Sequence, residues 1–148
     1  LAPRWETSAA DFVIRPGDVV INLTAQSLED GFMGRVCLVR EHDKSLLNQR
    51  IGRFRCNVDV LRPEFLFRCL QTSRFRQHAH ANCEGSKVKH MFWQHLAKYE
   101  IAIPNISVQE EVIAQCASID EAIGSLGSRL AASQQLAARL ANQLAGGT

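Results

Sequence analysis

The sequence contains no long hydrophobic run. Its longest apolar stretches, around residues 18–23 and 91–93, are far shorter than the roughly 20 residues that cross a bilayer. Residues 1–6 have neither an initiator Met nor the basic and apolar segments of a signal peptide, so we interpret the start as a cut inside a longer protein. We therefore expect a cytoplasmic protein without a membrane segment.

The sequence also lacks the motifs of a self-sufficient enzyme. It has no glycine-rich phosphate loop, no methyl-donor motif and no carboxylate cluster for metal-dependent cleavage. His78, His80 and Cys83 lack the second ligand pair of a structural zinc site, and His90 and His95 are five residues apart, off one helical face. No oxyanion hole or orienting acid accompanies Cys83 and His80. We predict a non-catalytic chain with no metal and no cofactor.

Cysteine is present, but in an odd number and at wide spacing. The five residues are Cys37, Cys56, Cys69, Cys83 and Cys116, most of them among apolar neighbours. This pattern favours reduced, buried thiols in a cytosolic protein. A disulfide framework is the less favoured alternative.

The remaining composition suits one domain with an appendage, since 148 residues are 46% apolar. Runs rich in β-branched residues predict short strands, and Pro63 suits the first turn of a helix. The predicted strands are 12–15, 19–23, 35–39, 47–55, 88–91 and 101–103, and the predicted helices are 63–70, 74–78 and 93–98. We predict an α+β fold, a small mixed α/β domain over residues 1–104 that lacks its N-terminal part.

Residues 105–148 show a different pattern, which predicts one long helix. Ser107 is the expected N-cap, with Glu110 completing a capping box, and Gly146 and Gly147 are the expected stop. Apolar or small residues alternate at spacings of four and three, which is the pattern of a coiled coil. We call this set the heptad stripe: Val112, Cys116, Ile119, Ile123, Leu126, Leu130, Ser133, Ala137, Leu140 and Leu144. We expect it to bury itself against a partner helix.

Basic residues are concentrated in the domain. Nine basic residues stand against three acidic ones between positions 49 and 89, whereas the helix from residue 107 has two against four. Amide and hydroxyl groups are interleaved with them, and such mixtures contact DNA phosphates and base edges. A solvated basic surface is the alternative, and Phe54 and Phe75 are more readily core residues than base-stacking platforms. The candidate DNA contacts are Thr24, Gln26, Ser27, Asn48, Gln49, Arg50, Arg53, Arg55, Arg74, Arg76, Lys87 and Lys89.

The order of these segments resembles the specificity subunit of type I restriction-modification systems. The resemblance covers nearly the whole chain and is carried by residues 15–22, 34–36, 47–51, 84–86, 101–104, 109–113 and 119–120. It implies a target-recognition domain that reads half of a split site in double-stranded DNA, followed by a conserved-region helix that acts as a spacer. The implied partners are methyltransferase subunits, a restriction subunit and a second half of the same kind.

The sequence thus favours a DNA-specificity module whose chemistry is supplied by other subunits. Two alternatives stay open. One is the recognition segment of a fused restriction-methylation enzyme, and the other is a coiled-coil oligomerising protein with a basic domain and no DNA role.

Overall fold

Within the described residues, an antiparallel sheet of three strands organises the domain, in the order β3–β1–β4. The central strand is β1 (Val19–Asn22), flanked by β3 (Val36–Leu38) and β4 (Ile51–Phe54). Side chains alternate across a strand, so Val19 and Ile21 point into the core while Val20 and Asn22 are only half-buried. The β-branched run predicted at 19–23 is therefore the centre of the fold.

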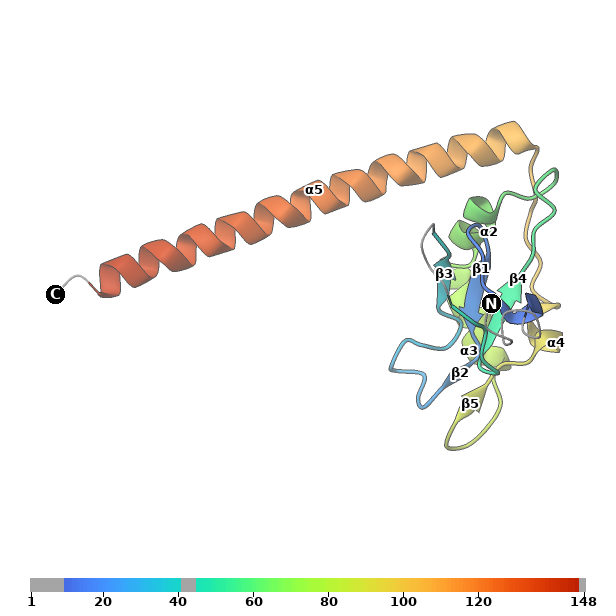
Figure 1. The fold of residues 1–148 in the computed structure, drawn as a ribbon. Helices are drawn as coiled ribbons and strands as arrows, with labels where there is room; N and C mark the ends of the chain where they lie inside the picture. Colours follow the sequence, from blue (N-terminus) through green and yellow to red (C-terminus); the bar gives the residue numbers. More distant parts are fainter. Residues whose placement is uncertain (1–9, 41–44, 147–148) are drawn as a thin grey trace, which may run out of the picture. The chain divides into compact units, whose positions relative to one another are not determined.

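The computed structural model describes residues 10–40 and 45–146. The chain divides into two compact units, residues 1–110 and 111–148. Short strands and short helices are followed by one long helix (Figure 1), which confirms the predicted α+β class. The predicted start at residues 1–6 lies outside the described residues.

Helices and a second small sheet complete the first unit (Figure 1). Strands β2 (Thr24–Ala25) and β5 (Lys89–His90) pair antiparallel at one end of the domain. The helices are a 3-10 turn (Ala10–Phe12), α2 (Pro63–Cys69), α3 (Ser73–Asn82) and α4 (Trp93–Leu96). Pro63 begins α2 as predicted, and α3 includes the histidine-rich segment.

The core lies between the main sheet and helices α2 and α3. Phe75 is buried against the ring of Tyr99, with centroids 5.0 Å apart, so its predicted core role is confirmed. Phe54 is half-buried and packs against Trp93 at 5.6 Å. Gly34 approaches α3 so closely that a Cβ there would lie 3.0 Å from that of Ala79.

The long helix α5 runs from Ile106 to Ala145. Its cap differs from the prediction: the side chain of Asn105 accepts a hydrogen bond from Val108 N (3.0 Å) and from the Ser107 hydroxyl (2.8 Å). Ser107 therefore lies inside the first turn, and Asn105 is the capping side chain. Residues 101–105 form no strand, which corrects the predicted strand at 101–103. Gly147 lies outside the described residues.

The first turn of α5 is bound to the domain by Gln109, which is fully buried. Its side-chain oxygen accepts from Arg62 N at 2.9 Å, and its amide donates to Val60 O (2.9 Å) and Pro104 O (2.8 Å). The neighbouring Glu110 carboxylate accepts from the Arg62 guanidinium at 2.7 Å. A buried amide with all these partners satisfied is a specific structural anchor.

All five cysteines lie in the described part of the chain and are free thiols. Cys37 is exposed and the other four are partly buried, so the expectation of buried thiols was wrong for Cys37. Burial raises the pKa of the Cys56 and Cys69 thiols above its ordinary value. Among the described residues, no helix has the length and apolar character needed to cross a membrane.

Candidate nucleic-acid interface

Three of the segments predicted to contact DNA meet at the end of β1. Leu23 donates its N–H to Arg50 O (2.8 Å) and accepts from Met91 N (2.9 Å). The turn of residues 48–50 and the segment after β5 therefore flank the start of β2, because both hydrogen-bond the same residue. Figure 1 shows β2 and β5 side by side at this end of the domain.

The hairpin of residues 84–90 is closed by backbone pairing. Glu84 N donates to His90 O at 2.8 Å, and His90 N donates to Glu84 O at 2.7 Å. The Lys89 amine turns back and donates to Gly85 O at 2.6 Å. Glu84 also contacts His95 Nε2 at 3.1 Å, which ties the hairpin to α4. These contacts fix the conformation of the hairpin, and Lys87 is exposed on it.

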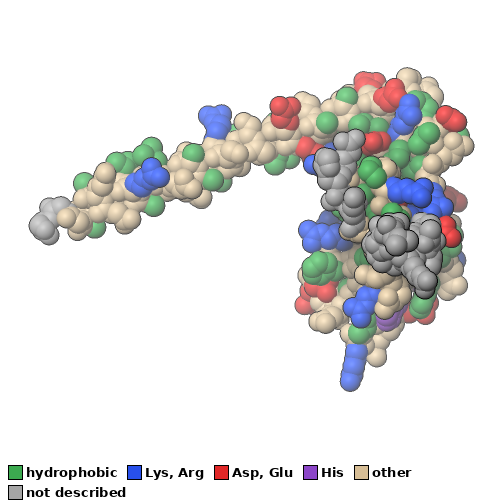
Figure 2. Space-filling view, viewed as in Figure 1, with side chains coloured by type: hydrophobic (Ala, Val, Ile, Leu, Met, Phe, Trp, Pro, Cys, Tyr) green, Lys and Arg blue, Asp and Glu red, His purple; other side chains and the backbone are tan. Residues whose placement is uncertain are grey.

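Several predicted contacts are exposed where these segments meet: Gln26, Ser27, Asn48, Gln49, Arg50 and Lys87. Figure 2 shows Lys or Arg side chains at the end of the domain formed by the β5 hairpin. In the described residues, the side chains of Gln49, Arg50 and Lys87 have no hydrogen-bond partner, whereas Asn48 Oδ1 accepts from Arg50 N at 2.8 Å. Asn48 therefore shapes the turn that presents Arg50.

Asp30 organises the loop that follows β2. Its carboxylate accepts from Phe32 N (2.8 Å) and Ser27 N (3.2 Å), while the Ser27 hydroxyl accepts from Asp30 N (3.2 Å). The pKa of the Asp30 carboxyl lies below its ordinary value, mainly because of the hydrogen bond from Phe32 N. Desolvation raises this pKa, and the weaker effects of the backbone hydrogen bonds from Ser27 and Gln26 lower it. Ser27 is thus partly engaged in loop structure.

Arg53 and Arg55 lie elsewhere. The Arg53 guanidinium donates to Val13 O (2.6 Å) and Asp11 O (2.7 Å) and pairs with Asp18 at 3.5 Å, with its side chain only 8% exposed. Arg53 therefore holds the N-terminal segment to the sheet and is not available to a ligand. Arg55 is exposed at the far end of β4, about 16 Å along the strand from Arg50.

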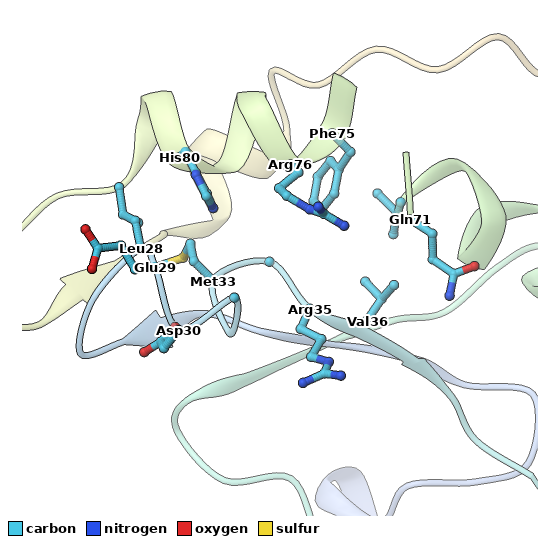
Figure 3. A pocket seen from close by; sticks show the side chains of 13 residues that line it. Leu28, Glu29, Asp30, Met33, Arg35, Val36, Gln71, Phe75, Arg76 and His80 are labelled. Carbon is cyan, nitrogen blue, oxygen red and sulfur yellow. The ribbon is translucent and has the colours of Figure 1, made fainter. Parts of the chain in front are cut away.

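Arg76 lies on α3 beside a hollow of about 630 Å³, and Figure 3 shows it with His80 facing residues 28–36. The hollow mixes charges, since Arg35 and Arg76 stand against Glu29 and Asp30. In the described residues, His80 Nε2 is buried without a hydrogen-bond partner. Mixed charge does not favour a dedicated anion site. Arg74 lies elsewhere, its guanidinium 5.5 Å from the Tyr99 ring centroid.

Sequence reasoning missed two residues at this end of the domain. His90 and Phe92 are exposed, and their rings stack with centroids 6.3 Å apart. No signal in the sequence indicated this exposure, because Met91, Phe92 and Trp93 form one apolar run in which no alternation of polar and apolar residues marks the exposed side. In the part of the chain that the structure describes, no three His, Cys, Asp or Glu side chains gather to hold a metal ion.

Gly85 is required by the hairpin. Its φ is +108°, and a Cβ there would overlap the carbonyl oxygen of Val88. Gly85→Ala is therefore expected to cost about 2–3 kcal/mol of unfolding free energy and to weaken DNA binding, because the hairpin must rearrange. The control is Gly17→Ala, which has φ +87° but no atom within 4 Å of a Cβ. If urea unfolding shows equal losses of unfolding free energy in the two variants, the overlap with Val88 O is not what makes Gly85 necessary.

Comparison with protein-family models gave no match, and no curated protein matches the chain in sequence. Among solved structures, the chain is similar to one described as "Crystal structure of Type-I restriction-modification system S subunit from M. genitalium". The TM-score is 0.60 at 16% identity, over 79% of this chain and 29% of that one. The chain thus spans less than a third of that subunit's length. The resemblance inferred from the sequence is confirmed in three dimensions: the chain has the fold of a segment of a type I restriction-modification S subunit.

Proposed function

We propose that this chain is a non-catalytic DNA-specificity module of a type I restriction-modification system. The observation that carries the proposal is the combination of an S-subunit fold with exposed basic and amide side chains around β2 and β5. The domain binds one half of a split duplex site. Methyltransferase and restriction subunits supply the chemistry.

The proposed surface is narrower than the set predicted from the sequence. It keeps Arg50 and Lys87 as phosphate contacts, because both are exposed and without a side-chain partner in the described residues. It leaves out Arg53, which is engaged by the backbone of residues 11 and 13. The second part of the proposal concerns α5, whose heptad stripe packs against another helix and sets the distance between two DNA-reading units.

The test is binding to a duplex pool with a randomised central segment, measured by fluorescence anisotropy over a salt series. Arg50→Glu combined with Lys87→Glu is expected to weaken binding roughly 100-fold near 0.1 M salt. The slope of log K against log salt should become shallower by about 2, since two phosphate contacts are lost.

The matched control is Arg129→Glu with Arg139→Glu, which changes the net charge equally but on α5. This variant is expected to keep most of the affinity. An equal loss in both double variants would show that only total charge matters. If the native chain does not bind duplex DNA at moderate salt, the result would instead favour an oligomerising protein without a DNA role.

A further inference from the structure

The small sheet of β2 and β5 has one buried and one exposed face. Directly opposed residues of an antiparallel pair point to the same side, so Thr24 shares a side with His90, and Ala25 with Lys89. Met91 lies two residues after Lys89 and so points to the same side as Lys89 and Ala25. Ala25 and Met91 are buried, with exposed fractions of 5% and 1%. The other side therefore faces solvent.

The exposed side continues beyond the paired residues. Gln26 and Val88 follow the Ala25–Lys89 pair and are both exposed, and Phe92 lies two residues after His90. We call the set the ribbon face; it consists of Thr24, Gln26, Val88, His90 and Phe92. Phe92 stacks on His90 at 6.3 Å and an interplanar angle of 19°, which fixes the orientation of the imidazole.

The polar groups of the ribbon face are unused. In the described residues, the side chains of Thr24, Gln26 and His90 make no hydrogen bond. By contrast, Asn22 nearby donates to Thr24 O (2.6 Å) and Phe32 O (3.0 Å), and Lys89 donates to Gly85 O. The structure thus separates side chains that hold the loops from side chains left free to bind.

Charge flanks this face without covering it. Arg50 lies beside Leu23, which connects β1 to β2, and Lys87 lies at the end of the hairpin. The arrangement places a hydroxyl, an amide and an imidazole between two cations. Cations at the borders of a reading element suit phosphates on either side of a groove, and neutral donors and acceptors between them suit base edges.

We propose that the β2–β5 ribbon enters the major groove of duplex DNA and reads bases through Gln26 and His90. This inference rests on the proposed function and assigns its specificity to particular residues. The major groove is about 12 Å wide and admits a two-stranded ribbon. Gln26 offers the paired donor and acceptor that match adenine, while His90, positioned by Phe92, offers one donor or acceptor to a neighbouring base. Val88 supplies apolar contact for a thymine methyl group.

The test is sequence selection from the same randomised duplex pool, followed by binding to the selected duplex and to a scrambled one. Gln26→Ala and His90→Ala are each expected to weaken the selected duplex about 10- to 100-fold and to leave the scrambled duplex unchanged. Each variant should lose preference at one or two base pairs only. Lys87→Ala is the contrasting variant and is expected to weaken both duplexes alike, with a salt slope shallower by about 1.

The outcomes separate the two proposals. If the native chain selects a sequence and Gln26→Ala and His90→Ala select the same one with the same affinity, the ribbon does not read bases and this inference is wrong. If the native chain binds no duplex, the proposed function fails and this inference fails with it. Because both side chains are exposed, the variants should keep the native circular dichroism spectrum and melting temperature. If a variant misfolds, Gln26→Glu and His90→Phe are measured in its place by the same criteria.

Discussion

Gln109→Met is expected to lower the free energy of unfolding by about 3 kcal/mol, with urea denaturation as the measurement. Methionine nearly preserves the side-chain volume but can neither accept from Arg62 N nor donate to Val60 O and Pro104 O. Leaving a buried group without its partner costs about 1–3 kcal/mol. Three groups lose their partner, Arg62 N, Val60 O and Pro104 O, and partial relaxation around them reduces the total cost to about 3 kcal/mol.

The neighbouring residue supplies the control. Glu110→Gln removes the ion pair with Arg62, whose two side chains are 35% and 55% exposed. Exposed pairs contribute about 1 kcal/mol or less, so this variant should be nearly as stable as the native protein. A Gln109→Met protein within 1 kcal/mol of the native one would refute the role of Gln109 as an anchor. Gln109→Glu should also be destabilised, because a carboxylate cannot donate to the two carbonyls.

Local patterns predicted most of the elements, but the strand expected at 12–15 was wrong, because residues 10–12 form a 3-10 turn and Val13 makes only an isolated bridge with Leu46. The β-branched run at 19–23, the Pro63 helix start and the strand before Trp93 all correspond to observed elements. These features depend on neighbours within a few residues, which a sequence displays directly. The strand expected at 101–103 failed because it had the residue types of a strand but no partner strand to pair with.

Long-range partners could not be predicted. Arg53 appeared as one more basic side chain, yet its partners lie 35–42 residues earlier in the chain. Gln109 binds groups as far as 49 residues away, and its burial has no local signal. The helix cap shows the same limit at short range, since Asn105 and Ser107 are both good capping residues and only the backbone geometry selects Asn105.

The ribbon face also had no clear signal in the sequence. Met91 and Phe92 belong to one apolar run, so their opposite exposure is not visible as an alternation of polar and apolar residues, and the strand β5 has only two residues. Only the pairing of Thr24 with His90 shows that two segments 66 residues apart share one surface. The DNA contacts expected from the sequence stay a prediction, and the assignment of base reading or phosphate contact to each residue stays a proposal.

Ile123→Asp with Leu130→Asp is expected to abolish helix pairing by α5, through which we propose that two DNA-reading units are held apart. Both residues of the heptad stripe are about 60% exposed in the single chain, and Figure 2 shows hydrophobic side chains along this helix. In a paired state both side chains would be desolvated. Two unpaired Asp carboxylates on each helix are too costly to bury, so the variant helices should not pair. Sedimentation velocity should show the native chain associating, with an apparent dissociation constant raised at least about 100-fold in the variant.

The control is Ser125→Asp with Ala132→Asp, which adds the same charge and similar helix propensity on the opposite face of α5. This variant should associate as the native chain does. If both variants dissociate equally, added charge or loss of helix is the cause, and circular dichroism distinguishes the two. If neither dissociates, the heptad stripe is not the interface. Because the stripe and the ribbon face occupy different units of the chain, the Ile123 and Leu130 variant should still bind a single half-site. Loss of half-site binding in a folded, monomeric variant would show that reading DNA and pairing helices are one function of this protein and not two.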